Sequence, residues 1–377
     1  MARRRIAHVI TGLAPDGAQQ MLLKLVSHID RGRFETVVVS LLEPAEGSIR
    51  RELEAEGAAV FDLGLRRALP DPRALARLGR ILSRFRPDLI QGWMYHGNLV
   101  ASAGRLLCRR ARLLWNIRHS IYSLADEKLQ TRQVIRMGAR LSRSPDRIIY
   151  CARVSAAQHA RLGYRAARSV VIPNGFDVSR FAPSAEARSE LRLSLGIPAG
   201  ARVVGNVGRY HPLKDHDNFL RAAALVAARD PGAHFVMVGR GLEPGNQTVT
   251  AAIGRLGLHG RAHLLGERDD VPRLMPGFDL YCLASIAEGF PNVLGEAMAS
   301  GVPCVTTEVG AAGEIVDGIG EAVPPRDPQA LAVGMLRLLG QSGEQLRERG
   351  QRSRQRVLER YALSGVVSRY EAIYDAL

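Results

Sequence analysis

The sequence contains few cysteines, few aromatic residues and no long apolar run. Only 4 of its 377 residues are cysteines, and Cys108, Cys151, Cys282 and Cys304 have neither CxxC nor metal-ligand spacing. We interpret them as small apolar core residues in a reducing cytoplasm. No run approaches transmembrane length. The apolar stretch after the basic first residues is too short for a signal peptide, so we expect none.

One ligand signature is missing, and a second is present only formally. No GxGxxG pattern occurs, so a nicotinamide dinucleotide site has little support. Asp215-His216-Asp217 is formally a D-x-D, a pattern with which some sugar-nucleotide enzymes hold a divalent metal. It opens a predicted helix, however, where aspartate caps the first turn and complements the helix dipole. We favour the capping interpretation and expect no metal and no cofactor.

The charge is distributed unevenly. Residues 1–180 hold 31 of the 52 Lys and Arg but only 15 of the 37 Asp and Glu, so the first half is basic and the second nearly neutral. Part of this charge lies on two predicted helices. A basic helix face can be solvated or can contact anionic lipid headgroups. Nucleic acid is disfavoured because the basic stretches lack interleaved aromatic residues. Arginines recur at helical spacing in two predicted basic helices, as Arg105, Arg109 and Arg112 and as Arg132, Arg136, Arg140 and Arg143.

The length exceeds what one hydrophobic core usually serves, so we expect two domains. Apolar strands alternate with helical segments in both halves, which predicts parallel sheets covered on both faces. We place a first domain over 1–178 and a second over 179–360, with a last helix, about 361–377, that packs back on the first. The expected strands are Ile6–Ile10, Thr36–Leu41, Val60–Leu63, Leu89–Gly92, Leu113–Ile117, Ile148–Cys151, Val170–Ile172, Val203–Val207, His234–Val238, His263–Leu265, Leu280–Leu283 and Cys304–Thr307.

The segment from Ala287 to Ala299 carries two carboxylates, Glu288 and Glu296. Its pattern predicts a loop at Glu288 and then a helix that begins with Pro291 at the first helical position. The first N–H groups of such a helix lack intrahelical partners and favour phosphate. Carboxylates accept charge-assisted hydrogen bonds from sugar or ribose hydroxyls. The segment therefore predicts a ligand with both phosphate and sugar.

Further polar residues of the second half follow predicted strands. Ligands of doubly wound sheets bind outside the carboxyl ends of the strands, so we expect a site in a cleft between the two domains. Arg209 and Lys214 follow Gly208 on one strand-to-helix loop and suit a diphosphate. Gly239 and Gly266 follow the next strands, where they serve a turn or approach the ligand.

The first half contributes its own candidates to the expected cleft. His119 follows the strand Leu113–Ile117, and we expect it to contact the substrate. His96, with Asn98, follows the preceding strand and is a candidate for the acceptor side. A glycine-containing turn from Gly12 to Gly17 precedes a helix and suits a phosphate or sugar oxygen.

Two further segments belong to the pattern, Ile172-Pro173-Asn174-Gly175-Phe176-Asp177 and Gly301-Val302-Pro303-Cys304-Val305. Together with the segments above, they resemble glycosyltransferase family 4 over nearly the whole chain. The resemblance implies the GT-B fold, an α/β fold with two Rossmann-like doubly wound domains facing across a cleft. It implies metal-independent transfer with retention of anomeric configuration, from a nucleotide sugar held mainly by the second domain. The other matching segments are Gly208-Arg209 with Lys214 and the Glu288/Glu296 segment.

The resemblance also implies roles for individual residues. Arg209 and Lys214 would bind the donor diphosphate, Glu296 the ribose and Glu288 the donor sugar. His119 would lie near the anomeric centre, and Gly17 would supply a backbone N–H. The catalytic set is then Arg209, Lys214, Glu288 and His119. The donor-binding set is Gly17, Gly208, Arg209, Lys214, Gly239, Gly266, Glu267, Arg268, Glu288, Phe290, Pro291, Asn292, Val293 and Glu296.

We therefore expect a retaining glycosyltransferase of class EC 2.4 at the cytoplasmic face of a membrane. Its donor would be a UDP-sugar or a GDP-mannose type of nucleotide sugar. Its acceptor would be a lipid-linked or cell-surface glycan, as in polysaccharide or lipopolysaccharide biosynthesis, and the basic first half would contact the inner leaflet. The alternatives are a transferase for a soluble acceptor, a sugar-nucleotide epimerase of the same fold, and a non-catalytic nucleotide- or glycan-binding protein.

Overall fold

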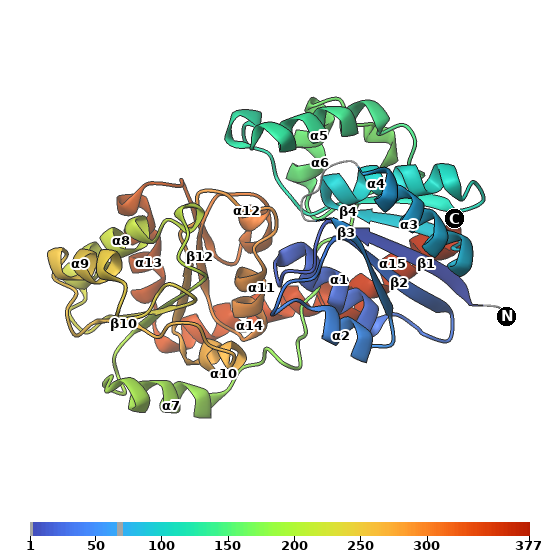
Figure 1. The fold of residues 1–377 in the computed structure, drawn as a ribbon. Coiled ribbons are helices and arrows are strands. Elements are labelled where there is room, and N and C mark those ends of the chain that lie inside the picture. Colours follow the sequence, from blue (N-terminus) through green and yellow to red (C-terminus); the bar gives the residue numbers. More distant parts are fainter. Residues whose placement is uncertain (1–2, 66–70) are drawn as a thin grey trace. The chain divides into compact units, whose positions relative to one another are not determined.

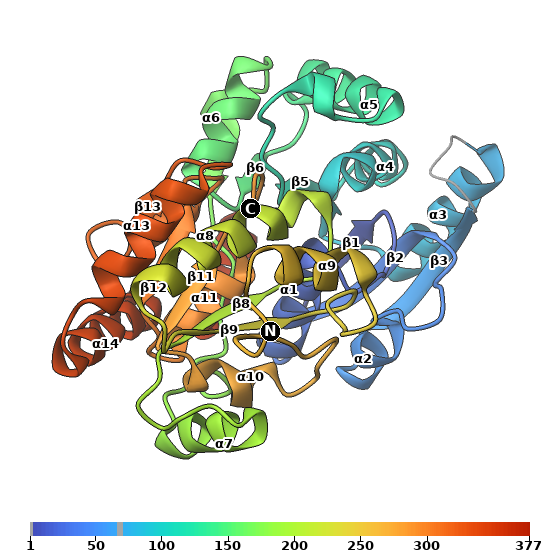
Figure 2. The same cartoon turned by 90° about the vertical axis from the view of Figure 1, so that its left-hand side faces the viewer.

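The computed structural model describes residues 3–65 and 71–377. The chain forms two compact units, which we call unit 1 (Met1–Gly175 with Leu363–Leu377) and unit 2 (Phe176–Ala362). Each unit is a parallel sheet with helices on both faces (Figure 1, Figure 2). The alternation of strands and helices predicted this architecture.

Unit 1 contains a seven-stranded parallel sheet in the order β3-β2-β1-β4-β5-β6-β7. The order reverses direction beside β1, which pairs with both β2 and β4. All seven predicted strands of the first half are confirmed. Their bounds are β1 (Arg4–Ile10), β2 (Phe34–Leu42), β3 (Ala59–Leu65), β4 (Leu89–Trp93), β5 (Arg112–Ile117), β6 (Arg147–Tyr150) and β7 (Ser169–Val171).

Side chains alternate between the two faces of this sheet and form two apolar clusters. Ile6 and Ile10 of β1 pack in the cluster that includes α1, α2 and α15, whereas Ala7 and Val9 pack in the cluster with α3, α4 and α5. Figure 1 shows these helix groups on opposite sides of the sheet. The helices are α1 (Gly17–His28), α2 (Arg50–Ala55), α3 (Pro72–Phe85), α4 (Met94–Leu107), α5 (Leu129–Leu141), α6 (Arg153–Arg161) and α15 (Leu363–Ala376), with short 3₁₀ turns η1 (Leu124–Asp126) and η2 (Ala166–Arg168).

The last helix, α15, is fixed to the unit 1 sheet by a buried arginine. Arg118, at the carboxyl end of β5, donates to Ile172 O at 2.7 Å and to the Tyr370 hydroxyl of α15. Its guanidinium also lies 6.0 Å from the centre of the Trp93 ring, within cation–π range. Burial lowers the pKa of Arg118 to about 10, which still leaves it charged at neutral pH.

Unit 2 contains a six-stranded parallel sheet in the order β10-β9-β8-β11-β12-β13. Its core joins α8, α9 and α13 to the sheet, through residues such as Phe219, Phe235 and Leu331. The strands are β8 (Val203–Val207), β9 (His234–Val238), β10 (Ala262–Leu264), β11 (Leu280–Leu283), β12 (Cys304–Thr307) and β13 (Glu321–Val323). The helices are α7 (Ala185–Leu195), α8 (His216–Arg229), α9 (Gln247–Arg255), α10 (Val271–Leu274), α11 (Asn292–Ala299), α12 (Ala312–Val316), α13 (Pro328–Leu339) and α14 (Gly343–Arg360), with 3₁₀ turns η3 (Pro212–Lys214) and η4 (Met275–Gly277).

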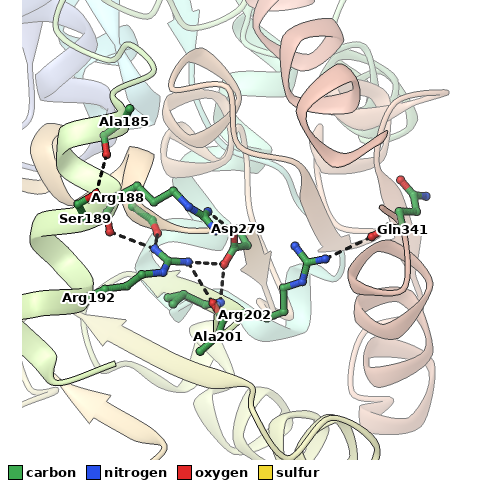
Figure 3. Close-up of polar contacts among 10 residues, drawn as sticks. Ala185, Arg188, Ser189, Arg192, Ala201, Arg202, Asp279 and Gln341 are labelled. Carbon is green, nitrogen blue, oxygen red and sulfur yellow. Dashed lines mark hydrogen bonds and ion pairs between the residues drawn. The ribbon is translucent and has the colours of Figure 1, made fainter. Parts of the chain in front are cut away.

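A buried ion pair holds α7 at the amino ends of β8 and β11 (Figure 3). The Arg192 guanidinium lies 2.6 Å from Asp279 Oδ2, and both side chains are about 5% exposed or less. The same carboxylate oxygen accepts from Val203 N at 2.8 Å, and Arg188 binds the other oxygen. Both oxygens of Asp279 are thus paired with guanidinium groups, and loss of Asp279 would leave the buried Arg192 charge uncompensated. The network is structural and lies at the edge of the sheet opposite the ligand loops.

Two sequence predictions about the strands and helices differ from the structure, in addition to the position of Pro291 described below. The second half holds a sixth strand, β13, that was not predicted, because its three residues include a charged one and carry no apolar run. The basic helix expected over Arg105 to Arg112 does not form as one element. Helix α4 ends at Leu107, Cys108 leaves the helical region, and Arg112 is the first residue of β5.

Within the described residues, no helix is both long enough and apolar enough to cross a bilayer. The four cysteines are free thiols, and all except the partly exposed Cys108 are buried, as expected of core residues. Burial raises the pKa of the Cys151 thiol to about 11.

Candidate active site

An ion pair joins two loops at the carboxyl edge of the unit 2 sheet. Lys214 ends the turn η3 that follows β8, and Glu288 lies on the loop that follows β11. The Lys214 Nζ atom lies 2.6 Å from Glu288 Oε1, and the two side chains are 27% and 13% exposed. A further backbone bond, from Ile286 N to Leu213 O at 2.9 Å, ties the same loops together. The ammonium and the carboxylate are therefore held in place, yet both remain accessible to a ligand.

Two hydroxyl residues that the sequence did not single out hold Glu288 in position. Ser285 Oγ donates to Glu288 Oε1 at 2.7 Å. Thr307 Oγ1, at the end of β12, donates to Ser285 O at 2.6 Å. Ser285 and Thr307 are both buried, so the two residues that support Glu288 are shielded from solvent. Their position at or just after the carboxyl end of a predicted strand is the signal that could have identified them, because parallel strands present these ends at the same edge of the sheet.

Close backbone approaches require glycine at two points of this edge. Gly239 follows β9 with φ +148°, and a Cβ atom there would overlap the Gly208 carbonyl. Gly310 has φ +54°, and a Cβ there would overlap the carbonyl of Glu288. Only glycine adopts such conformations without strain and also admits the neighbouring backbone. The loops after β8, β9, β11 and β12 are thereby packed backbone against backbone.

The N-terminus of α11 lies in the same loop cluster. Pro291 is the residue before the helix, with extended ψ 101°, rather than the first helical residue as predicted. A proline suits this position equally well, because its φ is fixed and no donor is lost. Asn292 and Val293 then begin the helix, and their N–H groups belong to the first turn, where intrahelical acceptors are lacking. Glu296 lies one turn on and is half-buried.

The remaining predicted donor residues have diverse surroundings. Arg209 is exposed on the loop after β8, and Glu267 is exposed after Gly266, which has φ +66°. Arg268 is bound by its own loop, because its Nε and Nη2 atoms donate to the two oxygens of Asp270 at 2.8 and 2.7 Å. Phe290 lies in an aromatic cluster with Phe176 and Tyr361, with ring centres 6.1 and 5.8 Å away.

The D-x-D segment acts as a helix start. Asp215 is the cap of α8, and its side chain accepts from Asn218 N at 3.3 Å. Asp217 pairs instead with Arg221 at 2.7 Å along the helix. The two carboxylates thus have separate partners. In residues 3–65 and 71–377, no group of three or more His, Cys, Asp or Glu is arranged to hold a metal.

In unit 1, His119 pairs with a carboxylate that sequence reasoning missed. His119 Nε2 lies 2.7 Å from Glu127 Oε1, and this hydrogen bond holds the pKa of Glu127 below its usual value. The Tyr95 ring packs edge-on against His119, with ring centres 6.1 Å apart. No sequence spacing distinguishes Glu127 from neighbouring carboxylates. The conformation of the loop between His119 and Glu127 determines that these two side chains meet.

A buried histidine lies behind His119. His159 Nδ1 is 2.7 Å from Ser155 O, which can only accept, so Nδ1 carries the proton. Its Nε2 is then an acceptor, and the Tyr95 hydroxyl, 2.8 Å away, must be the donor. Ser155 Oγ in turn donates to the backbone oxygen of His119. Tyr95, Ser155 and His159 therefore form one network beneath the His119 loop.

The other unit 1 candidates lie at or near the amino ends of helices. His96 is half-buried in the first turn of α4. Asn98 is 1% exposed, and its Oδ1 accepts from Asn116 N at 3.2 Å, so it connects α4 to β5 from inside the core. Gly17 is the first residue of α1, and Asp16 precedes it in extended conformation.

Both units match known protein families. Residues 15–180 match the model described as Glycosyltransferase Family 4, and residues 201–341 match the model described as Glycosyl transferases group 1. The crystal structure of Anabaena HepE in complex with UDP superimposes with a TM-score of 0.86 at 24% identity, over 99% of this chain and 100% of that one. At this identity the likeness concerns the fold.

Curated proteins with similar sequences are also glycosyltransferases by name. The Escherichia coli UDP-Gal:alpha-D-GlcNAc-diphosphoundecaprenol alpha-1,3-galactosyltransferase is 25% identical over 81% of this chain and 79% of its own length. The putative glycosyltransferase EpsF of Bacillus subtilis is 34% identical over 37% of this chain, a match that spans only 35% of EpsF.

Two Rossmann-like parallel sheets and the superposition on HepE define a protein of the GT-B fold, as the sequence predicted. Family models match both halves of the chain, and they specify the protein further. The chain belongs to glycosyltransferase family 4. This membership confirms the predicted family and the predicted enzyme class.

Proposed function

We propose that this protein transfers a sugar from a nucleoside-diphosphate sugar to a lipid-linked glycan, with retention of anomeric configuration and without a metal. The single observation that carries the proposal is the Lys214–Glu288 pair at the carboxyl edge of unit 2. It places a cation for phosphate and a carboxylate for hydroxyls within one hydrogen bond of each other. A ligand that satisfies both carries an anionic group next to a hydrogen-bond donor, as a nucleotide sugar does with its diphosphate and its hydroxyls.

The proposed chemistry follows from these groups. Departure of the nucleotide leaves negative charge on the diphosphate as the bond to the anomeric carbon breaks. Lys214, Arg209 and the first N–H groups of α11 stabilise that charge, and fixed donors of this kind lower the barrier most. Glu288 and Glu296 accept from sugar and ribose hydroxyls. The leaving phosphate takes the proton of the acceptor hydroxyl, so no covalent enzyme intermediate is needed.

Unit 1 contributes the acceptor side in this proposal. His119, oriented by Glu127, contacts the donor sugar near the reacting carbon, and Gly17 supplies a backbone N–H. These two assignments rest on the family resemblance. His96 is the further candidate for an acceptor contact, because it lies in the first turn of α4 and is not fully buried.

The proposal is tested by a donor screen followed by a transfer assay. Thermal shift against uridine, guanosine and thymidine diphosphate sugars identifies the donor, since tight binding raises the melting temperature. Transfer to a synthetic polyprenyl-diphosphate-linked sugar is then followed by NMR of the product's anomeric proton. Retained configuration is expected. Epimerised free nucleotide sugar would favour the epimerase alternative, and binding without turnover would favour a non-catalytic protein.

The lipid-linked acceptor is supported by the exposed face of α5. Leu129, Met137 and Leu141 are 68%, 45% and 42% exposed, and Arg136 and Arg140 flank them on the same face. The helix sequence contains no acidic residue. A helix with exposed apolar residues beside arginines suits the interface of an anionic bilayer. The E. coli relative, by its name, acts on a diphosphoundecaprenol-linked acceptor.

Membrane contact is tested separately from catalysis. Co-sedimentation with anionic vesicles at low salt is expected for the wild type and is expected to weaken as salt increases. Met137→Ser with Leu141→Ser should reduce binding while leaving transfer to a water-soluble acceptor analogue unchanged. If the wild type and the double variant sedimented equally, or if neither sedimented, this part of the proposal would be contradicted, whereas the transferase assignment would be unaffected. We place the protein, on this proposal, at the cytoplasmic face of the membrane.

A further inference from the structure

Four arginines line one open hollow at the amino edge of the unit 1 sheet. The hollow has a volume of about 520 Å³, and its lining is Arg143, Arg147, Arg165, Ala167 and Arg168. The arginines come from three segments: the turn after α5, the first residue of β6, and the residues around η2. No acidic residue belongs to the lining. Arginines from separate segments thus converge without a counter-charge.

The carboxylate of Asp146, the residue before Arg147, is engaged away from the hollow. Asp146 accepts from Leu113 N at 2.9 Å and lies 3.3 Å from Arg112 Nη1. Only its backbone oxygen faces the hollow's arginines, since Arg147 and Arg168 donate to it at 2.8 and 3.4 Å. In residues 3–65 and 71–377, none of the four guanidinium groups pairs with a carboxylate.

The frame of the hollow is fixed by buried contacts. The Arg165 backbone N–H donates to Ser142 Oγ at 2.9 Å, and Ser142 Oγ donates to Ala139 O at 2.7 Å at the end of α5. Ser142 is 1% exposed. The segments that carry Arg143 and Arg165 are therefore locked to each other. Four like charges on a fixed frame repel one another, and an anion among them removes that cost.

The hollow lies at the opposite edge of the sheet from the His119 loop. Arg147 begins β6, whereas His119 follows the end of β5, which runs parallel to β6. It is therefore distinct from the residues proposed for transfer. A guanidinium group can donate two parallel hydrogen bonds to two oxygens of one phosphate group. Phosphomonoesters and diphosphates carry more negative charge than phosphodiesters, so they suit a cluster of four arginines better.

We propose that Arg143, Arg147, Arg165 and Arg168 form a binding site for a phosphomonoester or diphosphate group, separate from the sugar-transfer site. The group has two possible sources, a soluble phosphate compound and the headgroup of a lipid. Because α5 runs toward the amino edge of the sheet, the hollow lies at the carboxyl end of the helix whose exposed face carries Met137 and Leu141. Both sources can therefore reach it.

The test compares Arg143→Ala/Arg165→Ala with Arg51→Ala/Arg80→Ala, which removes two exposed arginines elsewhere in unit 1 and so has the same net charge. One arm titrates inorganic pyrophosphate by calorimetry. The other measures co-sedimentation with phosphatidylcholine vesicles that contain phosphatidic acid, against vesicles with phosphatidylglycerol at equal charge. Binding of pyrophosphate at the sugar-transfer site is common to both variants and cancels in the comparison.

A loss of at least about tenfold in affinity, confined to the Arg143/Arg165 variant, is the expected result in one arm. Loss in the pyrophosphate arm alone identifies a soluble ligand, and loss of the preference for phosphatidic acid identifies a lipid. Arg143→Lys/Arg165→Lys should give an intermediate loss of affinity, because lysine keeps the positive charge but lacks the two parallel N–H donors of a guanidinium group. This variant also keeps the test valid if the alanine variant misfolds. Equal binding by both folded double variants in both arms would overturn the proposal.

Discussion

Lys214 Nζ lies 2.6 Å from Glu288 Oε1, so a cation and a carboxylate that are 74 residues apart in the chain form one pair. Each is anchored at its own strand end, Lys214 by the turn after β8 and Glu288 by Ser285 after β11. The pair keeps the ammonium in place before a substrate arrives. Preorganised charge of this kind costs no reorganisation during the reaction.

Lys214→Ala is expected to reduce transfer by roughly 100- to 1000-fold, because a fixed cation no longer faces the leaving diphosphate. The measurement is kcat at saturating donor, with circular dichroism to establish folding. Arg229→Ala is the matched control, since this exposed cation lies at the far end of α8. Near-normal turnover of a folded Lys214→Ala protein would exclude the assigned role.

Gly239→Ala is expected to displace the loop after β8, because the added Cβ would overlap the Gly208 carbonyl and φ is +148°. The unfolding free energy should fall by about 1–3 kcal/mol, and affinity for the donor nucleotide should fall with it. Urea denaturation and nucleotide titration give the two values. Gly245→Ala should change neither, since nothing lies within 4 Å of its Cβ position. Unaltered nucleotide affinity in Gly239→Ala would separate this loop from the donor site.

Glu127→Ala is expected to reduce transfer by about tenfold through loss of the hydrogen bond that orients His119. Glu127→Gln, which can still accept, should retain most of the activity. Asp126→Ala changes an adjacent exposed carboxylate and should behave as wild type. If Glu127→Gln and Glu127→Ala were equally impaired, the negative charge rather than the orientation of His119 would be what matters.

The protein should lose stability as pH falls from about 6.5 to 4. Burial lowers the pKa of His159 and of His216 from 6.5 to about 4, and that of His8 to about 3. Between those values the unfolded state binds more protons, so the unfolding free energy decreases with acidification, by roughly 3 kcal/mol for one such histidine. Urea midpoints at pH 7.5, 6 and 5 measure this. His159→Gln should flatten the dependence, and an unchanged slope would show that His159 does not contribute.

Removal of divalent metal should leave transfer unchanged, because Asp215 and Asp217 serve α8 rather than a metal. Asp215→Ala should cost about 0.5–2 kcal/mol of stability as a lost cap. Asp217→Ala should cost less, since its pair with Arg221 is exposed. Initial rates with EDTA and with added Mg²⁺ are the measurement. A rate that required Mg²⁺ and lost this requirement in Asp217→Ala would restore the metal interpretation of the D-x-D segment.

Much of the fold could be predicted because its elements carry local signals. The strands predicted over Val203–Val207, His234–Val238, Leu280–Leu283 and Cys304–Thr307 form with those bounds, and the last helix, predicted over about 361–377, spans Leu363–Ala376. Where the local signal is weak the prediction failed, as in the three-residue β13. The spacing of Arg105, Arg109 and Arg112 also gave a wrong prediction. These arginines have helical periodicity by chance, and a strand begins at Arg112.

The site was predictable only to the level of loops. Position after a strand brought Lys214 and Glu288 to one edge, because parallel strands present their carboxyl ends together. The contacts of each side chain depend on loop conformations that no spacing encodes. Glu127, Ser285 and Thr307 were therefore missed, although each directly holds a residue of the candidate site or its neighbour.

The sequence by itself determined the class of fold, the family and the strand-end loops that carry the candidate site residues, because periodicity and strand-end position are local properties. Tertiary structure alone decided which charges meet. It pairs Lys214 with Glu288 and His119 with Glu127, and it leaves the arginines around Arg165 without a carboxylate. The reason is physical: an electrostatic partner is set by distance in space, and residues many positions apart acquire that distance only when the loops are packed.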